Sequence, residues 1–63
     1  MTTFTIVTPP PYTKRQIVDV LLNDTLLGRA TILRVSPHEL LVRVGDRALA
    51  FQRHDGTNWT WTE

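Results

Sequence analysis

The sequence predicts a mainly β domain, an antiparallel meander of five to six short strands that curls toward a small SH3-like or Sm-like barrel. Short apolar runs alternate with polar residues along most of the chain, and these runs are rich in β-branched residues. The runs of the C-terminal half are separated by Gly45-Asp46 and Asp55-Gly56. Such pairs between strand-like runs are typical of tight β-hairpin turns. All 63 residues are therefore expected to form one domain.

The first twelve residues are expected to form a short strand and a proline-rich arm. Residues 2–7 alternate, with Phe4 and Ile6 on one side. Residues 9–11 are three consecutive prolines, which lack the backbone N–H that a central strand needs. The meander itself should occupy residues 13–63.

Residues 13–23 fit two interpretations. Thr13 and Gln16 have the spacing of a helix capping box, and the apolar residues that follow fall on one arc of a helix. This alternative gives an α+β fold, with one short helix at 13–23 packed on a four-stranded antiparallel sheet. The β-branched residues of the 17–22 segment instead favour a strand. We retain the strand as the main prediction.

The strand interpretation makes 17–22 the first arm of a hairpin. It turns at Asn23-Asp24 and returns as a strand over 25–35, where Gly28 marks a bulge or a close approach. Ser36-Pro37-His38 then reverses the chain.

The next hairpin has a register that follows from its turn. A two-residue loop at Gly45-Asp46 joins strands over 39–44 and 47–53 and pairs Leu40 with Phe51. Because side chains alternate between the faces of a sheet, this register predicts a core face. That face carries Leu40, Val42, Val44, Leu49 and Phe51.

The last hairpin is expected to turn at Asp55-Gly56 and to include a strand over 57–62. A two-residue loop there pairs Phe51 with Thr60 and Gln52 with Trp59. Thr60 would then join the core face. The opposite face would carry Glu39, Leu41, Arg43, Ala48, Ala50, Gln52, Trp59 and Trp61.

That opposite face is the leading candidate for a partner-binding surface. Tryptophan and arginine are enriched among the residues that dominate binding energy at protein interfaces. The candidate residues are Trp59, Trp61, Arg43, Leu41 and Gln52, followed by Arg29 and Arg34 of the 25–35 strand. The structural alternative is that residues 1–12 fold over this face and cover the indoles.

Composition narrows the function classes. Seven basic and six acidic residues give a net charge of +1, which is unlike a strongly basic nucleic-acid binder. The chain has no cysteine, and its two histidines, His38 and His54, fall in predicted turns without a spaced third metal ligand. We therefore expect no enzyme activity, no cofactor and no metal. No apolar run is long enough to span a membrane and no secretory signal is present, so a cytoplasmic location is expected.

Two segments resemble a known family. Residues Met1-Thr2-Thr3-Phe4-Thr5-Ile6-Val7-Thr8 are similar to the start of one of the small type I-F anti-CRISPR proteins of Pseudomonas phages. Leu49-Ala50-Phe51, Asp55-Gly56 and Trp59 resemble the C-terminal hairpin of another. The resemblance implies a phage protein that inhibits a bacterial CRISPR–Cas complex or nuclease stoichiometrically and without catalysis. It assigns no site residues.

A second resemblance concerns the fold. Residues 18–25, Gly28 and residues 35–38 are similar in spacing to the first Sm motif, although the Asn-Gly turn of that motif is absent. This resemblance implies a small barrel.

The leading functional hypothesis is a non-enzymatic phage inhibitor that binds a host CRISPR–Cas effector or nuclease in the host cytoplasm. The first alternative is a small barrel that binds nucleic acid. The second is a structural component of phage assembly. A chain of this size has a small core, so a homodimer remains open as well.

Overall fold

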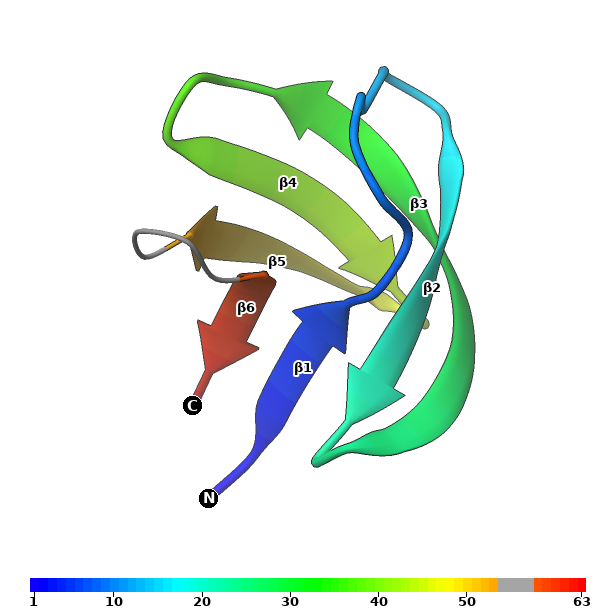
Figure 1. Ribbon diagram of the computed structural model, residues 1–63, viewed down its shortest axis with the longest axis vertical. Helices are drawn as coiled ribbons and strands as arrows, with labels where there is room; N and C mark the ends of the chain where they lie inside the picture. Colours follow the sequence, from blue (N-terminus) through cyan, green and yellow to red (C-terminus); the bar gives the residue numbers. More distant parts are fainter. Residues whose placement is uncertain (54–57) are drawn as a thin grey trace.

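The computed structural model describes residues 1–53 and 58–63, which form an antiparallel barrel of six strands (Figure 1). Each strand pairs with the next along the chain, and the last pairs with the first to close the barrel. The strands are β1 (Thr3–Ile6), β2 (Ile17–Leu22), β3 (Thr25–Val35), β4 (Glu39–Val44), β5 (Arg47–Arg53) and β6 (Trp59–Thr62). The mainly β prediction is confirmed. Within the described residues, no helix has the length and apolar character needed to cross a membrane.

The segment with two interpretations forms a turn and then β2. The capping-box contact does form, because the Thr13 N–H donates to Gln16 Oε1 over 2.9 Å. The turn does not propagate, since Arg15 has a φ of 73°, outside the helical region. Its N–H donates to the Ile32 carbonyl over 2.7 Å, and the Ile32 N–H donates to the Gln16 carbonyl over 2.9 Å. Pairing with β3 therefore takes the backbone groups that a helix would have used.

The turn between β2 and β3 also fixes β1. Asn23 and Asp24 both have positive φ, 48° and 70°, as a type I′ turn requires. The Thr3 N–H donates to Asn23 Oδ1 over 2.9 Å, and the Asn23 N–H donates to the Thr3 carbonyl over 2.9 Å. This turn therefore holds the start of β1 against the end of β2.

Gly28 marks a bulge, as predicted. It pairs with Val20 where the β2–β3 register shifts, and its φ is 148°, a conformation that other residues rarely adopt. A Cβ atom placed at Gly28 would meet no atom within 4 Å. The glycine is thus required by the backbone and not by a close approach.

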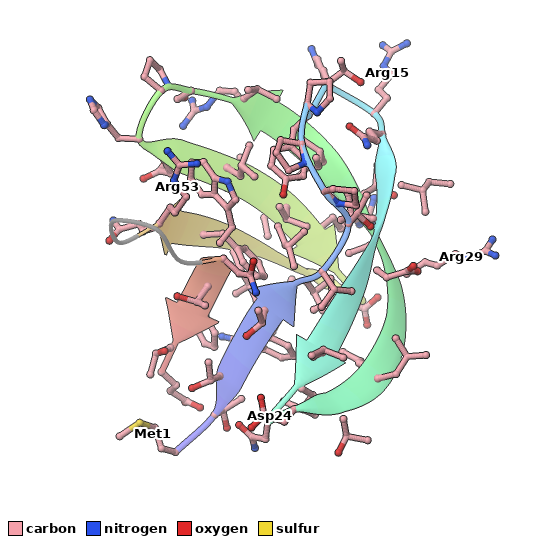
Figure 2. The ribbon with its side chains drawn as sticks, in the orientation of Figure 1. Met1, Arg15, Asp24, Arg29 and Arg53 are labelled. Atoms are coloured by element: carbon pink, nitrogen blue, oxygen red, sulfur yellow. The ribbon has the colours of Figure 1, made fainter. Side chains whose placement is uncertain are left out.

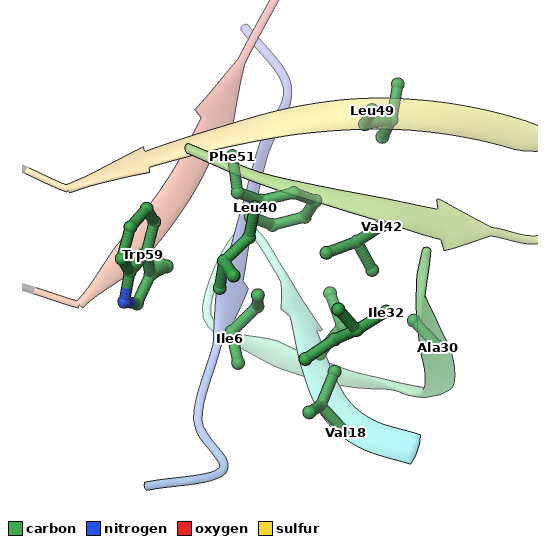
Figure 3. Packing of buried hydrophobic residues seen from close by; sticks show 10 residues of the cluster. Ile6, Val18, Ala30, Ile32, Leu40, Val42, Leu49, Phe51 and Trp59 are labelled. Atoms are coloured by element: carbon green, nitrogen blue, oxygen red, sulfur yellow. The ribbon is translucent and has the colours of Figure 1, made fainter. Parts of the chain in front are cut away.

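The β4–β5 hairpin has the predicted register. Leu40 pairs with Phe51 and Val42 pairs with Leu49 across the turn that Gly45 opens with a φ of 62°. These four residues share the barrel interior, where Leu40, Val42 and Phe51 have no exposed surface (Figure 3). Val44 is half-buried at the edge of the same face. The complete core consists of Ile6, Val18, Val20, Ala30, Ile32, Leu40, Val42, Leu49, Phe51 and Trp59.

The register predicted for the last hairpin is wrong by one residue. Gln52 pairs with Thr60, and Arg53 pairs with Trp59. A slip of one residue exchanges the two faces of a strand. Trp59 and Trp61 therefore share the inner side with Phe51, and Thr60 lies on the outer side. The Asp55-Gly56 turn itself lies outside the described residues.

Indole burial explains this difference. Each large aromatic side chain that leaves water buries about 150–250 Å², equivalent to about 4–6 kcal/mol as an upper bound. Local strand and turn preferences of single residues amount to about 1 kcal/mol. The free energy gained by moving both indoles inward therefore exceeds the local preferences from which the other register was predicted.

The Phe51→Ala substitution should destabilise the protein by about 3–5 kcal/mol, because Phe51 is fully buried at the centre of the barrel. This loss is comparable with the total stability expected for a domain of this size. Urea denaturation followed by circular dichroism measures it. A folded Phe51→Ala protein with an unchanged denaturation midpoint would contradict the assigned core.

Candidate binding surface

Trp59 fills one end of the barrel. Only 8% of its surface is exposed, and it packs against the core. The Tyr12 ring meets it edge-on, with the ring centroids 6.3 Å apart and an interplanar angle of 89°. The Tyr12 hydroxyl donates to the Thr8 carbonyl over 2.7 Å, which fixes the ring in the proline-rich arm. The Arg53 guanidinium lies 5.6 Å from the Trp59 ring centroid.

Trp61 lies near the C-terminal end of β6, beside the point where the Glu63 N–H donates to the Thr2 carbonyl. It is half-buried, and its ring packs against Phe4 of β1, with the centroids 5.5 Å apart. The Arg47 guanidinium lies 5.3 Å from the Trp61 ring centroid. Phe4 and Tyr12 of residues 1–12 therefore do contact the indoles, but they do so on the inner side of the sheet and not on the outer face where the sequence placed the indoles.

Arg47 and Arg53 are functional candidates that the sequence-based prediction of the site did not include. On β5, alternation places both on the same side as Leu49 and Phe51. Their positions at the two ends of the strand let their stems cover the barrel while their guanidinium groups stay in water. This alternation around a buried pair was the signal that could have identified them.

An opening interrupts the barrel wall between β5 and β6. The ladder between these strands consists of the pairs Gln52–Thr60 and Arg53–Trp59. Ala50 and Thr62 would form the next hydrogen-bonded pair of this ladder, but they line a cavity of about 320 Å³ instead. Its lining residues are Ala50, Gln52, Thr60, Trp61 and Thr62. This volume is at the lower end of the roughly 300–1,000 Å³ that ligand sites occupy.

The structure separates the predicted surface into two parts. Leu41, Arg43 and Gln52 lie together on the outer side of β4 and β5, as predicted. Trp59 does not join them, since it is buried inside the barrel. Trp61 is attached to the inner side, but it reaches the cavity that Gln52 also lines. The opening is therefore the place where the outer surface and one tryptophan meet.

The two arginines of β3 have different surroundings. Arg34 Nη2 lies 3.5 Å from Glu39 Oε1, and the Arg34 side chain is largely exposed, so this ion pair contributes little stability. Arg29 pairs with Asp19 in the ladder and extends away from the barrel into solvent (Figure 2). Neither residue lines the opening.

A second cavity of about 290 Å³ lies at the Trp59 end, lined by Pro37, His38, Arg53 and Trp59. His38 is exposed there, and His54 lies outside the described residues. In residues 1–53 and 58–63, no three histidine, cysteine or acidic side chains come together as metal ligands would.

The β2–β3 hairpin exposes several large apolar side chains. Leu26 is 65% exposed and pairs with Leu21, and the neighbouring Leu27 is 48% exposed. Ile17 is 59% exposed at the other end of β2.

No protein-family model, curated protein or solved structure matches this chain. The geometry of the barrel wall is therefore the basis on which we assign a function.

The two tryptophans should differ in their contribution to stability. Trp59→Ala should cost about 3–5 kcal/mol because its indole is buried in the core. Trp61→Ala should cost clearly less, since half-buried surface contributes less on removal. Chemical denaturation of both variants compares the two costs. Equal losses would show that Trp61 is as much a core residue as Trp59.

The sole tyrosine provides a pH-dependent prediction. Burial raises the pKa of the Tyr12 hydroxyl above its ordinary value of 10.0, against a smaller opposite effect from Arg53. The folded state then retains this proton to higher pH than the unfolded state does. Its contribution to stability is complete below pH 10.0 and is lost as pH rises through the folded-state pKa.

Denaturation midpoints measured from neutral to strongly alkaline pH should therefore decline more steeply for the wild type than for Tyr12→Phe. Ultraviolet absorbance of the tyrosinate reports the folded-state pKa directly. Tyrosinate formation at the ordinary pKa, with parallel pH profiles for the two proteins, would contradict the burial of Tyr12.

Proposed function

We propose that the protein is a non-enzymatic inhibitor that acts by occupying a surface of a larger host protein complex. The observation that supports this proposal is the opening beside Trp61. It combines an aromatic ring, a guanidinium 5.3 Å from that ring, and a cavity of about 320 Å³ between β5 and β6. Aromatic and arginine side chains around a concave site are the usual anchors of protein interfaces.

The proposed target is a bacterial CRISPR–Cas effector in the cytoplasm of the host. The resemblance of both ends of the chain to small anti-CRISPR proteins supports this choice. Residues of β1, β5 and β6 carry the resemblance, and these strands are adjacent in the barrel, because β6 pairs with β1 on one side and with β5 on the other. Such an inhibitor works by stoichiometric occupancy and requires no reaction.

Nucleic-acid binding is the second candidate function. The observation that favours it is the placement of Arg47 and Arg53 over indole rings, since arginine and tryptophan together stack on unpaired bases. The near balance of seven basic and six acidic residues argues against it as the main activity. Binding to phosphates weakens steeply with salt, whereas an aromatic-anchored protein interface weakens less.

Adding the protein to a purified type I-F surveillance complex should abolish cleavage of target DNA once the protein is equimolar with the complex. Arg47→Glu should weaken this inhibition about tenfold or more, because it removes the cation above Trp61 and reverses its charge. Cleavage titrations at constant complex concentration measure both effects.

Lys14→Glu makes the same change of charge at an exposed position of the turn before β2 and serves as the matched control. It should inhibit like the wild type. Full cleavage in the presence of excess wild-type protein would overturn the proposed target. Binding of a labelled single-stranded oligonucleotide that disappears with added salt would support the second candidate instead.

A further inference from the structure

We propose that the opening between β5 and β6 binds an extended acidic peptide segment of the partner as an added strand along β5. This inference rests on the proposed function, because it specifies which part of a protein partner the opening recognises. Strand addition to a sheet edge gives affinity through backbone hydrogen bonds and specificity through alternate side chains.

The backbone of β5 has free groups on the side of the opening. The two-residue turn makes Val44 and Arg47 a hydrogen-bonded pair, and such pairs alternate along an antiparallel ladder. The N–H and carbonyl groups of Leu49 therefore face β4, and those of Ala48 and Ala50 face away from it. The described β5–β6 pairs begin only at Gln52, so Ala48 and Ala50 have no strand partner there.

The opposite wall of the opening is built in the same way. The Glu63 N–H donates to the Thr2 carbonyl over 2.9 Å, so the backbone of Glu63 faces β1. Alternation then directs the backbone groups of Thr62 toward β5, where they also lack a strand partner. The opening thus presents donors and acceptors from both strands, as an incoming extended backbone requires.

The outer side chains of β4 and β5 determine what such a strand can carry. Ala48 and Ala50 are small, so they do not shield the side chains behind them on β4. Arg43 pairs with Ala48, and Leu41 pairs with Ala50. In an added antiparallel strand, the residue opposite Ala50 would pack toward Leu41. The residue two positions later, opposite Ala48, would lie within reach of the long Arg43 side chain.

Charge complementarity makes this second residue acidic. Arg43 and Arg47 are exposed, and within the described residues the ion pair observed is between Arg34 and Glu39. Arg43, which lies on the same outer side as Ala48, is thus available to a carboxylate. A second copy of the chain fits less well, because it would bring its own Arg47 and Arg53 into the same place. The expected segment has an apolar residue followed two positions later by an acidic one.

The free protein provides the first test. Backbone hydrogen exchange followed by NMR should show fast exchange for the Ala48 and Ala50 amides and slow exchange for Leu49 and Phe51. This result depends on no ligand. Equal protection of all four amides would show that the opening is closed in solution and would overturn the inference.

The second test uses the blocked peptide acetyl-Thr-Val-Thr-Glu-Thr-amide. At saturating concentration it should slow the exchange of the Ala48 and Ala50 amides. The same peptide with lysine in place of glutamate should bind about tenfold more weakly, and so should the intact peptide with Arg43→Glu. Lys14→Glu should leave the affinity unchanged, because Lys14 lies in the turn before β2 and does not line the opening.

Peptide methylation separates strand addition from simple charge attraction without altering the protein. N-methylation of the valine or the glutamate should weaken binding about fivefold or more, because those amides would face β5. N-methylation of the threonine between them, whose amide would face β6, should weaken binding less, because on that side the described strand presents the backbone groups of Thr62 alone. Equal effects at all three positions would overturn the added strand.

Binding of an oligothymidine but not the peptide would assign the opening to nucleic acid, and protection that grows with protein concentration alone would assign it to a second copy.

The two proposals can fail separately. Peptide binding without inhibition of the surveillance complex would retain the strand site and reject the proposed target. Inhibition that survives Arg43→Glu, with no protection of the Ala48 and Ala50 amides in the complex, would retain the inhibitor and reject the strand site.

Discussion

Burial of two indoles on the inner side of β6 is the constraint on which the rest of the barrel depends. Trp59 packs into the core at one end, and Trp61 packs against Phe4 nearer the other. These contacts determine the register of β6 and bring β1 against it, and that pairing closes the sheet. They also explain the path of the proline-rich arm, because Tyr12 must reach the edge of the Trp59 ring. A barrel of this size has few other large side chains with which to fill its ends.

The same constraint produces the opening in the wall. β6 pairs with β1 through Thr62, but its pairing with β5 ends at Thr60. With its indoles turned inward, β6 follows β1 and diverges from β5, so backbone groups remain free beside a half-buried ring. A site of recognition thus arises from the packing that stabilises the fold. Arg47 and Arg53 combine both roles, since their stems cover apolar surface and their charges remain exposed.

The candidate site was only partly predictable. Leu41, Arg43 and Gln52 could be placed together on the outer side of the sheet because the Gly45-Asp46 turn sets the β4–β5 register. The side of β6 on which the tryptophans lie could not be predicted, because a change of one residue in the β5–β6 register exchanges the two faces of the strand. Arg47 was within reach of sequence reasoning, because it alternates with Leu49 and Phe51 on β5. The opening could not be predicted, because the residue types of a strand do not indicate where its hydrogen-bonded ladder ends.

The sequence by itself determined the β class, the strands over 25–35, 39–44 and 47–53, and the core face that Leu40, Val42, Leu49 and Phe51 share. These features follow from local alternation and short turns, which act between near neighbours in the chain. For 17–22 it left a helix and a strand open, and pairing with β3 decided the strand. Only the tertiary structure decided the side on which Trp59 and Trp61 lie, the closure of β6 on β1, and the opening beside β5. These depend on burying large side chains among residues distant in sequence, and that gain in free energy exceeds any local turn preference.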